Sequence, residues 1–203
     1  MTANAEKMYT YIRGYANGRE MTQTLCALSF AREQHRGQVR KSGEPYVVHP
    51  LTMACHALAL GINDDNTVAT ILLHELCEDC GVSVNALPVN DTVRHAVNLM
   101  TFTVMDGETK DMAKNRYYNL LATSREAAIT KLIDRCHNVS SMAGVFSVER
   151  LRAYITETRQ YVLPLYRKIK DEFPADSDSL FVLKYHITSV VDAIDETLRA
   201  CEH

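Results

Sequence analysis

The chain has 203 residues, of which 46% are hydrophobic and 23% are charged, and its formal net charge at pH 7 is −3. These values are typical of a soluble globular domain and exclude a disordered, collagen-like or coiled-coil chain. The small negative charge gives no electrostatic reason to expect a nucleic acid as partner. Because sheets use Gly and Pro in their many turns, a content of only eight Gly and five Pro favours helices, and we expect an all-α fold.

Membrane insertion and export are also not expected. Residues 45–63 hold no Lys, Arg, Asp or Glu, but their apolar part covers only residues 51–62, which is short of the ~20 residues of a membrane span. The N-terminal residues lack the apolar core of a signal peptide. The sequence therefore predicts a cytoplasmic protein without membrane contact, in which the six Cys stay reduced.

Gly, Pro and capping residues divide the chain into helical segments. In chain order, we expect helices at residues 3–15, 20–35, 50–60, 65–79, 91–101, 109–122, 124–138, 148–170 and 175–201. A loop with two Gly and one Pro is expected at residues 36–46. Asn63, Asp64 and Asp65 are candidate N-caps of the fourth helix, and residues 123–126 form a capping-box pattern before the seventh. Pro164 is expected to kink or end the last turn of the helix at 148–170.

The expected helix at 65–79 is apolar in its middle and should be interior, yet it ends in the sequence HELCED. On a continuous helix, one imidazole and three carboxylates would share an arc of about 140°. They belong to His74, Glu75, Glu78 and Asp79. Carboxylates crowded at a buried helix end need a cation nearby, which a divalent metal or charged partner side chains would supply. The simpler interpretation is a solvated turn of charges, although carboxylates at a helix C-terminus oppose the macrodipole.

Other polar residues are ambiguous when each group is taken alone. His49, at the start of an apolar helix, is a packing or capping residue or a metal ligand. Arg40 and Lys41 belong to a loop that suits phosphate contacts or solvated charges. On the expected helix at 124–138, the polar arc holds Lys131, Asp134, Arg135 and Asn138. Taken alone, Asp134 flanked by Lys131 and Arg135 is more often part of a surface ion-pair cluster than a ligand. Structural roles are expected for Cys77, Cys80, His35, His56, His95, His137, His186 and His203.

Three motifs, in this order, resemble those of the hydrolase domains of the RelA/SpoT family. RKSGEPYVVHP at residues 40–50 is similar to the family pattern R-K-x-G-x-P-Y-x-x-H-P, and LLHELCED at residues 72–79 is similar to L-L-H-D-x-x-E-D. KLIDRCHN at residues 131–138 resembles K-L-A-D-R-x-x-N, and residues 154–165 continue into a family stretch that ends in P-L. The resemblance extends over about residues 22–168, and three ordered motifs are far more specific than one.

The resemblance implies the helical fold of the HD superfamily, as a single hydrolase domain over residues 1–203 with a C-terminal helical appendage at residues 175–201. The implied activity is removal of the 3′-pyrophosphate of (p)ppGpp with Mn²⁺, with Fe²⁺ or another divalent ion as the alternative cofactor. The implied metal ligands are His49, His74, Glu75 and Asp134. The implied catalytic carboxylates are Glu78 and Asp79. The implied contacts of the guanosine nucleotide substrate are Arg40, Lys41, Asn138 and Tyr154.

One residue departs from the family pattern, because Glu75 stands where the pattern has Asp. Glu is one methylene longer, so its carboxylate must fold back or the metal must shift, although ligand distances tolerate only ~0.2 Å. The negative charge and the carboxylate chemistry survive this exchange. We therefore expect weakened or retuned metal binding rather than its loss.

Two alternatives to (p)ppGpp hydrolysis stay open. The same site could remove the 2′-phosphate of NADPH, or the protein could bind a nucleotide or a partner without turnover. The long bifunctional enzymes of the family continue into a synthetase domain, so the 203 residues resemble a stand-alone small alarmone hydrolase. The segment after Pro174 is a candidate dimerisation helix, which leaves a homo-oligomer open.

Overall fold

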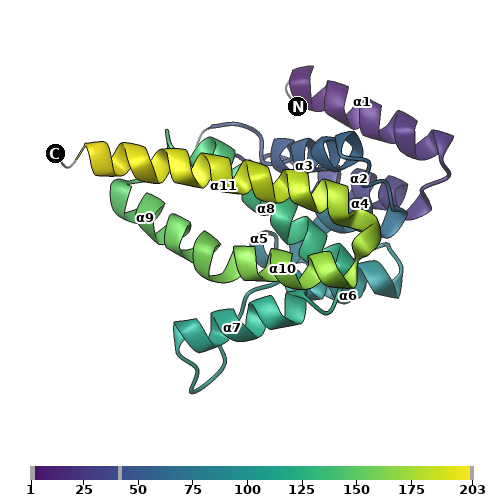
Figure 1. The fold of residues 1–203 in the computed structure, drawn as a ribbon. Helices are drawn as coiled ribbons and strands as arrows, with labels where there is room; N and C mark the ends of the chain where they lie inside the picture. Colours follow the sequence, from purple (N-terminus) through teal and green to yellow (C-terminus); the bar gives the residue numbers. More distant parts are fainter. Residues whose placement is uncertain (1–2, 41–42, 202–203) are drawn as a thin grey trace.

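The computed structural model describes residues 3–40 and 43–201, and the regular elements within these residues are helices (Figure 1). The expected all-α fold is thereby confirmed. The α-helices are α1 (Ala3–Gly18), α2 (Thr22–Gln34), α3 (Val48–Ala59), α4 (Asp65–Leu73), α5 (Leu76–Asp79), α6 (Asp91–Met100), α7 (Lys110–Leu121), α8 (Arg125–Met142), α9 (Val148–Glu157), α10 (Leu163–Glu172) and α11 (Ser177–Ala200). Short 3₁₀ turns lie at Val84–Ala86 and Pro174–Asp176, and a π-helical turn lies at Thr158–Val162. Across the described part of the chain, no helix is long and apolar enough to cross a membrane.

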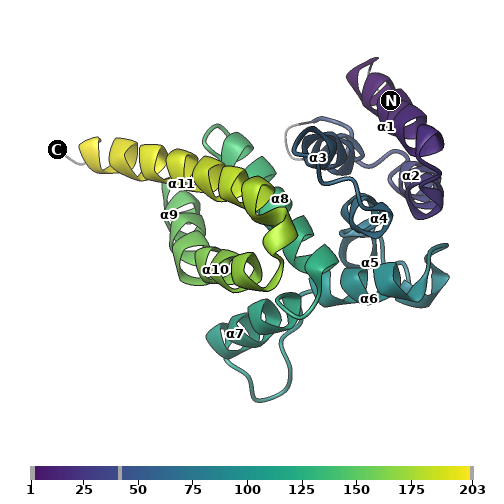
Figure 2. The ribbon, with the colours of Figure 1, turned by 45° about the vertical axis from the view of Figure 1, so that its right-hand side comes forward.

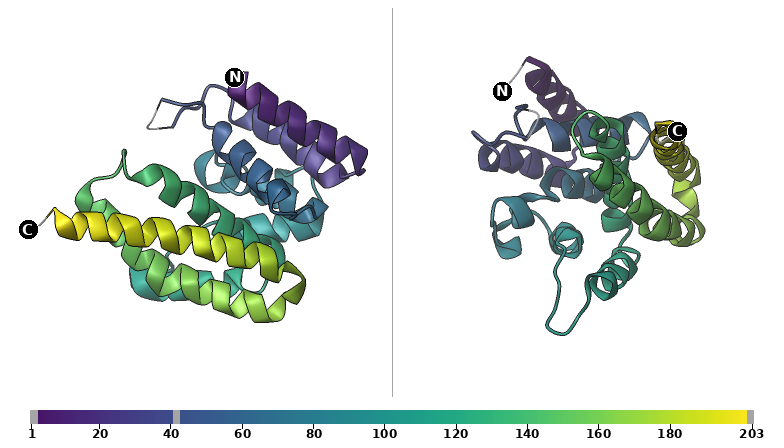
Figure 3. Two further views of the ribbon diagram at one scale, coloured as in Figure 1. Left: turned by 45° about the horizontal axis from the view of Figure 1, so that its top comes forward. Right: turned by 90° about the vertical axis from the view of Figure 1, so that its left-hand side faces the viewer.

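Two helices, α4 and α8, lie at the centre of the bundle. α4 packs against α2, α3, α6 and α8, and Figure 2 shows it between α3 and α6. The predicted interior position of this segment is confirmed, because every side chain from Thr67 to Leu73 is buried. α8 packs against α3, α4 and α6, and Figure 3 shows α11 running alongside it. One continuous core therefore fixes the relative positions of α3, α4 and α8.

Side-chain caps explain where several helices begin. Of the three candidate caps for α4, Asp64 is the one used, and its carboxylate accepts a hydrogen bond from the Thr67 amide at 2.9 Å. The next residue, Asp65, caps α2 by accepting a hydrogen bond from the Thr24 amide at 2.7 Å, which ties α2 to α4. The capping-box pattern also predicts the right helix, since Ser124 caps the first turn of α8.

The prediction of one continuous helix over residues 65–79 is wrong, because the helix breaks at His74 and Glu75. α4 ends at Leu73, and the single turn α5 begins at Leu76. In a continuous helix, the carbonyl of Ile71 would accept a hydrogen bond from the amide of residue 75. Here the Nδ1 atom of His74 donates to that carbonyl at 2.8 Å, so a side chain competes with the backbone for it. The arc expected for residues 74–79 therefore does not apply.

The predicted helix at 148–170 is also interrupted, at a place other than expected. α9 ends at Glu157, the π-helical turn follows, and α10 begins at Leu163. Pro164 lies in the first turn of α10, where a helix does not need the N–H group that Pro lacks. The interruption therefore precedes Pro164, and the helix continues beyond it to Glu172.

Candidate metal centre and adjoining cavity

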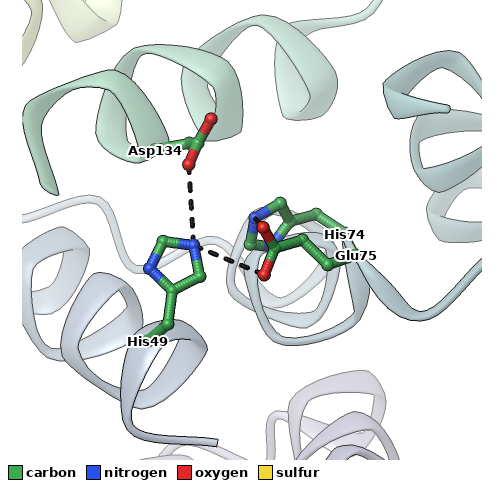
Figure 4. Close-up of side chains that lie close together, drawn as sticks. All are labelled: His49, His74, Glu75 and Asp134. Atoms are coloured by element: carbon green, nitrogen blue, oxygen red, sulfur yellow. Dashed lines mark ion pairs between the residues drawn. The ribbon is translucent and has the colours of Figure 1, made fainter. Parts of the chain in front are cut away.

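Four side chains from three parts of the chain converge in the core (Figure 4). His49 lies in the first turn of α3, and Asp134 lies in the middle of α8. His74 and Glu75 lie at the break between α4 and α5. The Nε2 atom of His49 is 3.5 Å from one carboxylate oxygen of Glu75 and 3.5 Å from one of Asp134. The structure thus brings together all four residues that the family resemblance implies as metal ligands.

The atoms that face one another in this cluster lack hydrogen-bond partners among the described residues. They are Nε2 of His49, Nε2 of His74 and Oε2 of Glu75, and all three are buried. Unpaired buried polar atoms cost free energy, so several of them aimed at one point indicate a missing ligand. The ligand atoms of the cluster lie within 4.8 Å of one another. Donors ~2.0–2.2 Å from one metal ion lie ~3–4.4 Å apart, so shifts of a few tenths of an ångström would bring these four residues to the spacing of a divalent-ion site.

Each imidazole of the cluster uses its second ring nitrogen in a hydrogen bond. The Nδ1 atom of His74 donates to the Ile71 carbonyl, so Nε2 is the ring nitrogen that can offer a lone pair to a metal. The Nδ1 atom of His49 lies 2.9 Å from the Nδ1 atom of His137. The sequence did not predict this contact of His137, although the residue lies one helical turn after Asp134 on the same face of α8.

Burial governs the charges of the cluster. It lowers the pKa of His49 to about 3, so this imidazole is neutral at pH 7, as a metal ligand must be. Burial also raises the pKa of Glu75. Burial also disfavours the ionised form of Asp134, but the neighbouring Lys131 ammonium holds the pKa of Asp134 well below its usual value. The Nζ atom of Lys131 is 3.0 Å from the Asp134 carboxylate. The cluster thus holds an ionised carboxylate in the core.

The interpretation of Lys131, Asp134 and Arg135 as a surface cluster is wrong, although Lys131 and Asp134 do form an ion pair. Asp134 is 5% exposed and Arg135 is 1% exposed. Arg135 donates a hydrogen bond to Glu157 at 2.7 Å, and its guanidinium lies 3.9 Å from the centroid of the Tyr154 ring. The other carboxylate oxygen of Glu157 accepts from Lys114 at 2.5 Å. Arg135 therefore connects α8 with α9 and packs against the ring of a residue expected to contact the nucleotide.

The two carboxylates of α5 are exposed and face different neighbours. Glu78 lines a cavity beside the metal cluster. Asp79 accepts a hydrogen bond from the Tyr46 hydroxyl, and the Tyr46 ring stacks on His35, which directly follows α2, with the centroids 4.9 Å apart. Burial and the nearby Glu75 raise the pKa of Tyr46, so its hydroxyl remains a donor at pH 7. Of the two carboxylates, only Glu78 is among the residues that line the cavity.

A cavity of about 530 Å³ adjoins the cluster, between α5, α7, α8 and α9, and its volume is typical of a small-ligand site. Lys110 and Lys114 of α7 and Arg150 of α9 line it, and cations beside metal ligands suit a phosphate-bearing ligand. The motifs do not contain these three residues. The spacing of the two lysines predicts a shared helix face, but only the packing of α7 shows what that face lines. The other lining residues are His74, Glu75, Glu78, Met100, Phe102, Tyr117, Tyr118, Lys131, Asp134 and Glu157.

The residues expected to contact a nucleotide lie in two places. The Nη2 atom of Arg40 donates to the Oδ1 atom of Asn138 at 3.4 Å, so the loop before α3 meets α8. Asn138 also donates to Asp134 at 2.6 Å, which places it beside the cluster. Tyr154 lies on α9 and is not among the residues that line the cavity. Lys41 lies outside the described residues.

The sequence is also similar to that of known proteins. Residues 27–166 match the family model of the HD domain. The guanosine-3′,5′-bis(diphosphate) 3′-pyrophosphohydrolase of Aquifex aeolicus is 32% identical over 148 residues, which are 70% of this chain and 21% of that protein. The bifunctional (p)ppGpp synthase/hydrolase SpoT of Escherichia coli is 26% identical over 172 residues, which are 81% of this chain and 24% of that protein. The chain thus spans less than a quarter of the length of these two relatives.

A solved structure shares the fold. It is described as a metazoan ortholog of SpoT that hydrolyzes ppGpp and plays a role in starvation responses. The two structures align with a TM-score of 0.63 at 20% sequence identity, over 85% of this chain and 95% of the other. The family match spans all three motifs on which the resemblance rests, from α3 through the α4–α5 break to α8. The resemblance is thereby confirmed, and the chain belongs to the HD domain family.

Proposed function

We propose that this protein is a metal-dependent hydrolase that removes the 3′-pyrophosphate of (p)ppGpp and releases GDP or GTP and pyrophosphate. The observation that carries the proposal is the group of unpaired, buried ligand atoms beside a cavity lined by cations and by Glu78. Such a site can hold a metal ion and a phosphorylated substrate side by side. The relatives named as 3′-pyrophosphohydrolases support the choice of (p)ppGpp as that substrate.

The proposed ion is Mn²⁺, with Fe²⁺ or another divalent ion as the alternative. Imidazole and carboxylate ligands suit these ions, and the cluster formed by the described residues contains no thiolate that would favour zinc. The proposed ligands are His49, His74, Glu75 and Asp134. When bound, the ion would supply Lewis acidity toward the water nucleophile and toward the phosphoryl oxygens.

The protein groups around this site have distinct proposed roles. Glu78 accepts the proton of the attacking water, because this residue lines the cavity beside the cluster. Asp79, held by the Tyr46 hydroxyl, helps to position that water. Lys110 and Arg150 offset the negative charge of the substrate phosphates within the cavity. The proposed nucleotide contacts are Arg40, Lys41, Asn138 and Tyr154.

We also propose that residues 1–203 form a single HD-type hydrolase domain, with residues 175–201 as its C-terminal helical appendage. α11 packs against α8 and α10 with Leu180, Leu183, Ile187 and Val191 buried. Arg159 of the π-helical turn forms ion pairs with Asp192 at 2.8 Å and with Asp195 at 2.7 Å. The appendage therefore shares the core of the domain, and we expect both to unfold in one transition.

A turnover assay with ppGpp and NADPH as parallel substrates, each with Mn²⁺ and with EDTA, tests the proposed function. We expect GDP and pyrophosphate from ppGpp, separated by anion-exchange chromatography, and loss of both products in EDTA. Release of phosphate from NADPH with no turnover of ppGpp would indicate a 2′-phosphatase. Binding of ppGpp without turnover of either substrate would indicate a binding protein with a weakened site.

Removal of the metal is expected to lower the melting temperature by several degrees. The ligands come from α3, from the α4–α5 break and from α8, so a bound ion links three parts of the fold. A ligand that binds only the folded state stabilises it by about 2.7 kcal/mol at a concentration 100 times its Kd. Differential scanning fluorimetry of Mn²⁺-loaded and EDTA-treated protein measures the effect. Equal melting temperatures would contradict a site built from these residues.

Exchange of Glu75 for Asp is expected to tighten Mn²⁺ binding on the order of threefold, with turnover equal or higher. The Glu side chain has one more rotatable bond than Asp, and this bond must be ordered when the metal binds. Glu75→Ala is expected to weaken binding, because it removes a negative charge from the ligand set. A Mn²⁺ titration of the three proteins at one pH measures both effects. Identical affinities would show that residue 75 does not contact the metal.

A further inference from the structure

His137 is a partly buried residue of α8 whose ring contacts the ring of His49. The two Nδ1 atoms are 2.9 Å apart, and the ring centroids are 4.5 Å apart with the planes at 65°. His137 is not one of the four side chains whose ligand atoms converge. It therefore contacts a proposed ligand without belonging to the ligand set.

The tautomer of His49 decides whether this residue can bind a metal. Its Nε2 atom faces the carboxylates of Glu75 and Asp134, as Figure 4 shows, and needs a free lone pair to act as a ligand. A neutral imidazole has one ring proton, which must then lie on Nδ1. This N–H group points at the Nδ1 atom of His137, which must be an unprotonated acceptor. His137 therefore carries its own ring proton on Nε2.

The two imidazoles of the cluster differ in what fixes their tautomers. His74 donates its Nδ1 proton to the backbone carbonyl of Ile71, an acceptor that no side-chain exchange removes. His49 donates instead to another side chain, and a ring nitrogen can be either a donor or an acceptor. If His137 presented an N–H group at this position, His49 would have to accept with Nδ1 and carry its proton on Nε2. That tautomer cannot bind a metal through Nε2.

We propose that His137 is a positioning residue, which accepts a hydrogen bond from His49 Nδ1 and thereby holds His49 in the tautomer and orientation that bind the metal. This inference rests on the metal site of the proposed function and extends it to a residue outside the ligand set. Loss of such a partner of a ligating histidine typically weakens metal affinity by about 10–100-fold.

Two substitutions of similar shape separate the hydrogen bond from simple packing. In Asn, the Oδ1 atom is bonded to Cγ as Nδ1 is in His, so His137→Asn keeps an acceptor near the same place. The Leu side chain of His137→Leu has nearly the same shape as that of Asn but contains no hydrogen-bond acceptor. We expect the Kd of Mn²⁺, measured from the electron paramagnetic resonance signal of free Mn²⁺, to stay within about threefold for His137→Asn and to rise about 10–100-fold for His137→Leu.

The matched control is His186→Leu. The Nε2 atom of His186 lies 2.9 Å from the Ser140 hydroxyl, so this variant also removes a hydrogen-bonded imidazole packed on α8, but one outside the cluster. Its Mn²⁺ affinity should equal that of the wild type. Equal affinities of the two His137 variants, or an equal loss in His186→Leu, would overturn the proposal. Melting temperatures of the metal-free variants show whether each is folded.

The wild-type protein gives a second readout that needs no variant. Long-range ¹H–¹⁵N correlation spectra of the histidine rings, recorded with Zn²⁺ as a diamagnetic probe, report which nitrogen of each ring carries the proton. We expect a proton on Nδ1 of His49 and on Nε2 of His137, and a proton on Nδ1 of His137 would overturn the proposal. If the wild-type protein binds Mn²⁺ but does not hydrolyse ppGpp, the proposed function is contradicted and the role of His137 is not. If the protein binds no divalent ion, both are overturned.

Discussion

Replacing Glu78 by Gln is expected to lower the turnover of ppGpp by about 10²–10⁴-fold while the protein still binds Mn²⁺, because an amide cannot take up the proton of the attacking water. Glu78 lines the cavity beside the cluster but is not among the four side chains whose ligand atoms converge. The exchange removes a charge without changing the shape of the side chain. Steady-state turnover and a Mn²⁺ titration of the same preparation measure the two effects separately.

The neighbouring Asp79→Asn exchange is the matched control for Glu78→Gln, since it also turns a carboxylate of α5 into an amide. Asp79 is held by the Tyr46 hydroxyl and does not line the cavity, so we expect a smaller loss of turnover. Loss of Mn²⁺ binding in Glu78→Gln would show that Glu78 is a ligand rather than the base. An equal loss of turnover in both variants would show that the two carboxylates act as a unit.

Much of the architecture follows from local features of the sequence. The N-caps Asp64 and Ser124 mark the starts of α4 and α8, and the apolar run after Asp64 predicts the buried helix that is found. Scarcity of Gly and Pro predicts the all-α class. These features depend on residues close together in the chain, and single-sequence patterns describe such short-range effects well.

The cluster itself was predictable from the motifs but not from helix geometry. His74 and Glu75 lie at a break between two helices, so the arc calculated for a continuous helix places them wrongly. The break involves a hydrogen bond between the His74 ring and a backbone carbonyl, and periodicity does not predict side-chain bonds of this kind. The motifs still identify the right residues, because they carry the identities of the side chains rather than their angles on a helix.

Contacts between distant segments account for what the sequence did not predict. Asp134 and Arg135 looked like surface charges, because the sequence does not show that α3 and α9 pack over them and bring His49 to Asp134 and Glu157 to Arg135. His137 gains its role only when α3 packs against α8. Three cations of the cavity wall, Lys110, Lys114 and Arg150, belong to α7 and α9 and to none of the three motifs. Sequence spacing alone does not show which helices pack together, so these residues emerge only from the tertiary structure.

Replacing Asp134 by Asn is expected to weaken Mn²⁺ binding at least ~100-fold, because loss of a mere partner of a ligating histidine already costs ~10–100-fold. The neutral amide is a poorer ligand than the carboxylate that the core holds ionised. The exchange also leaves Lys131, whose Nζ lies 3.0 Å from Asp134, without its charged partner, so the metal-free variant should melt at a lower temperature. A Mn²⁺ titration and a melting curve of the same sample separate these two consequences.

Asp176→Asn is the control that distinguishes a ligand from a structural carboxylate. Asp176 is 8% exposed and pairs with Arg125 at 2.7 Å, so it matches Asp134 in burial and in having a cationic partner, but it lies outside the cluster. We expect Asp176→Asn to lower the melting temperature and to leave the Mn²⁺ affinity unchanged. Asp134→Asn could instead lower only the melting temperature and leave the Mn²⁺ affinity equal to that of the wild type. Asp134 would then be a partner of Lys131 and not a ligand. Because both variants remove one buried negative charge, a difference in metal affinity between them can come only from the position of that charge.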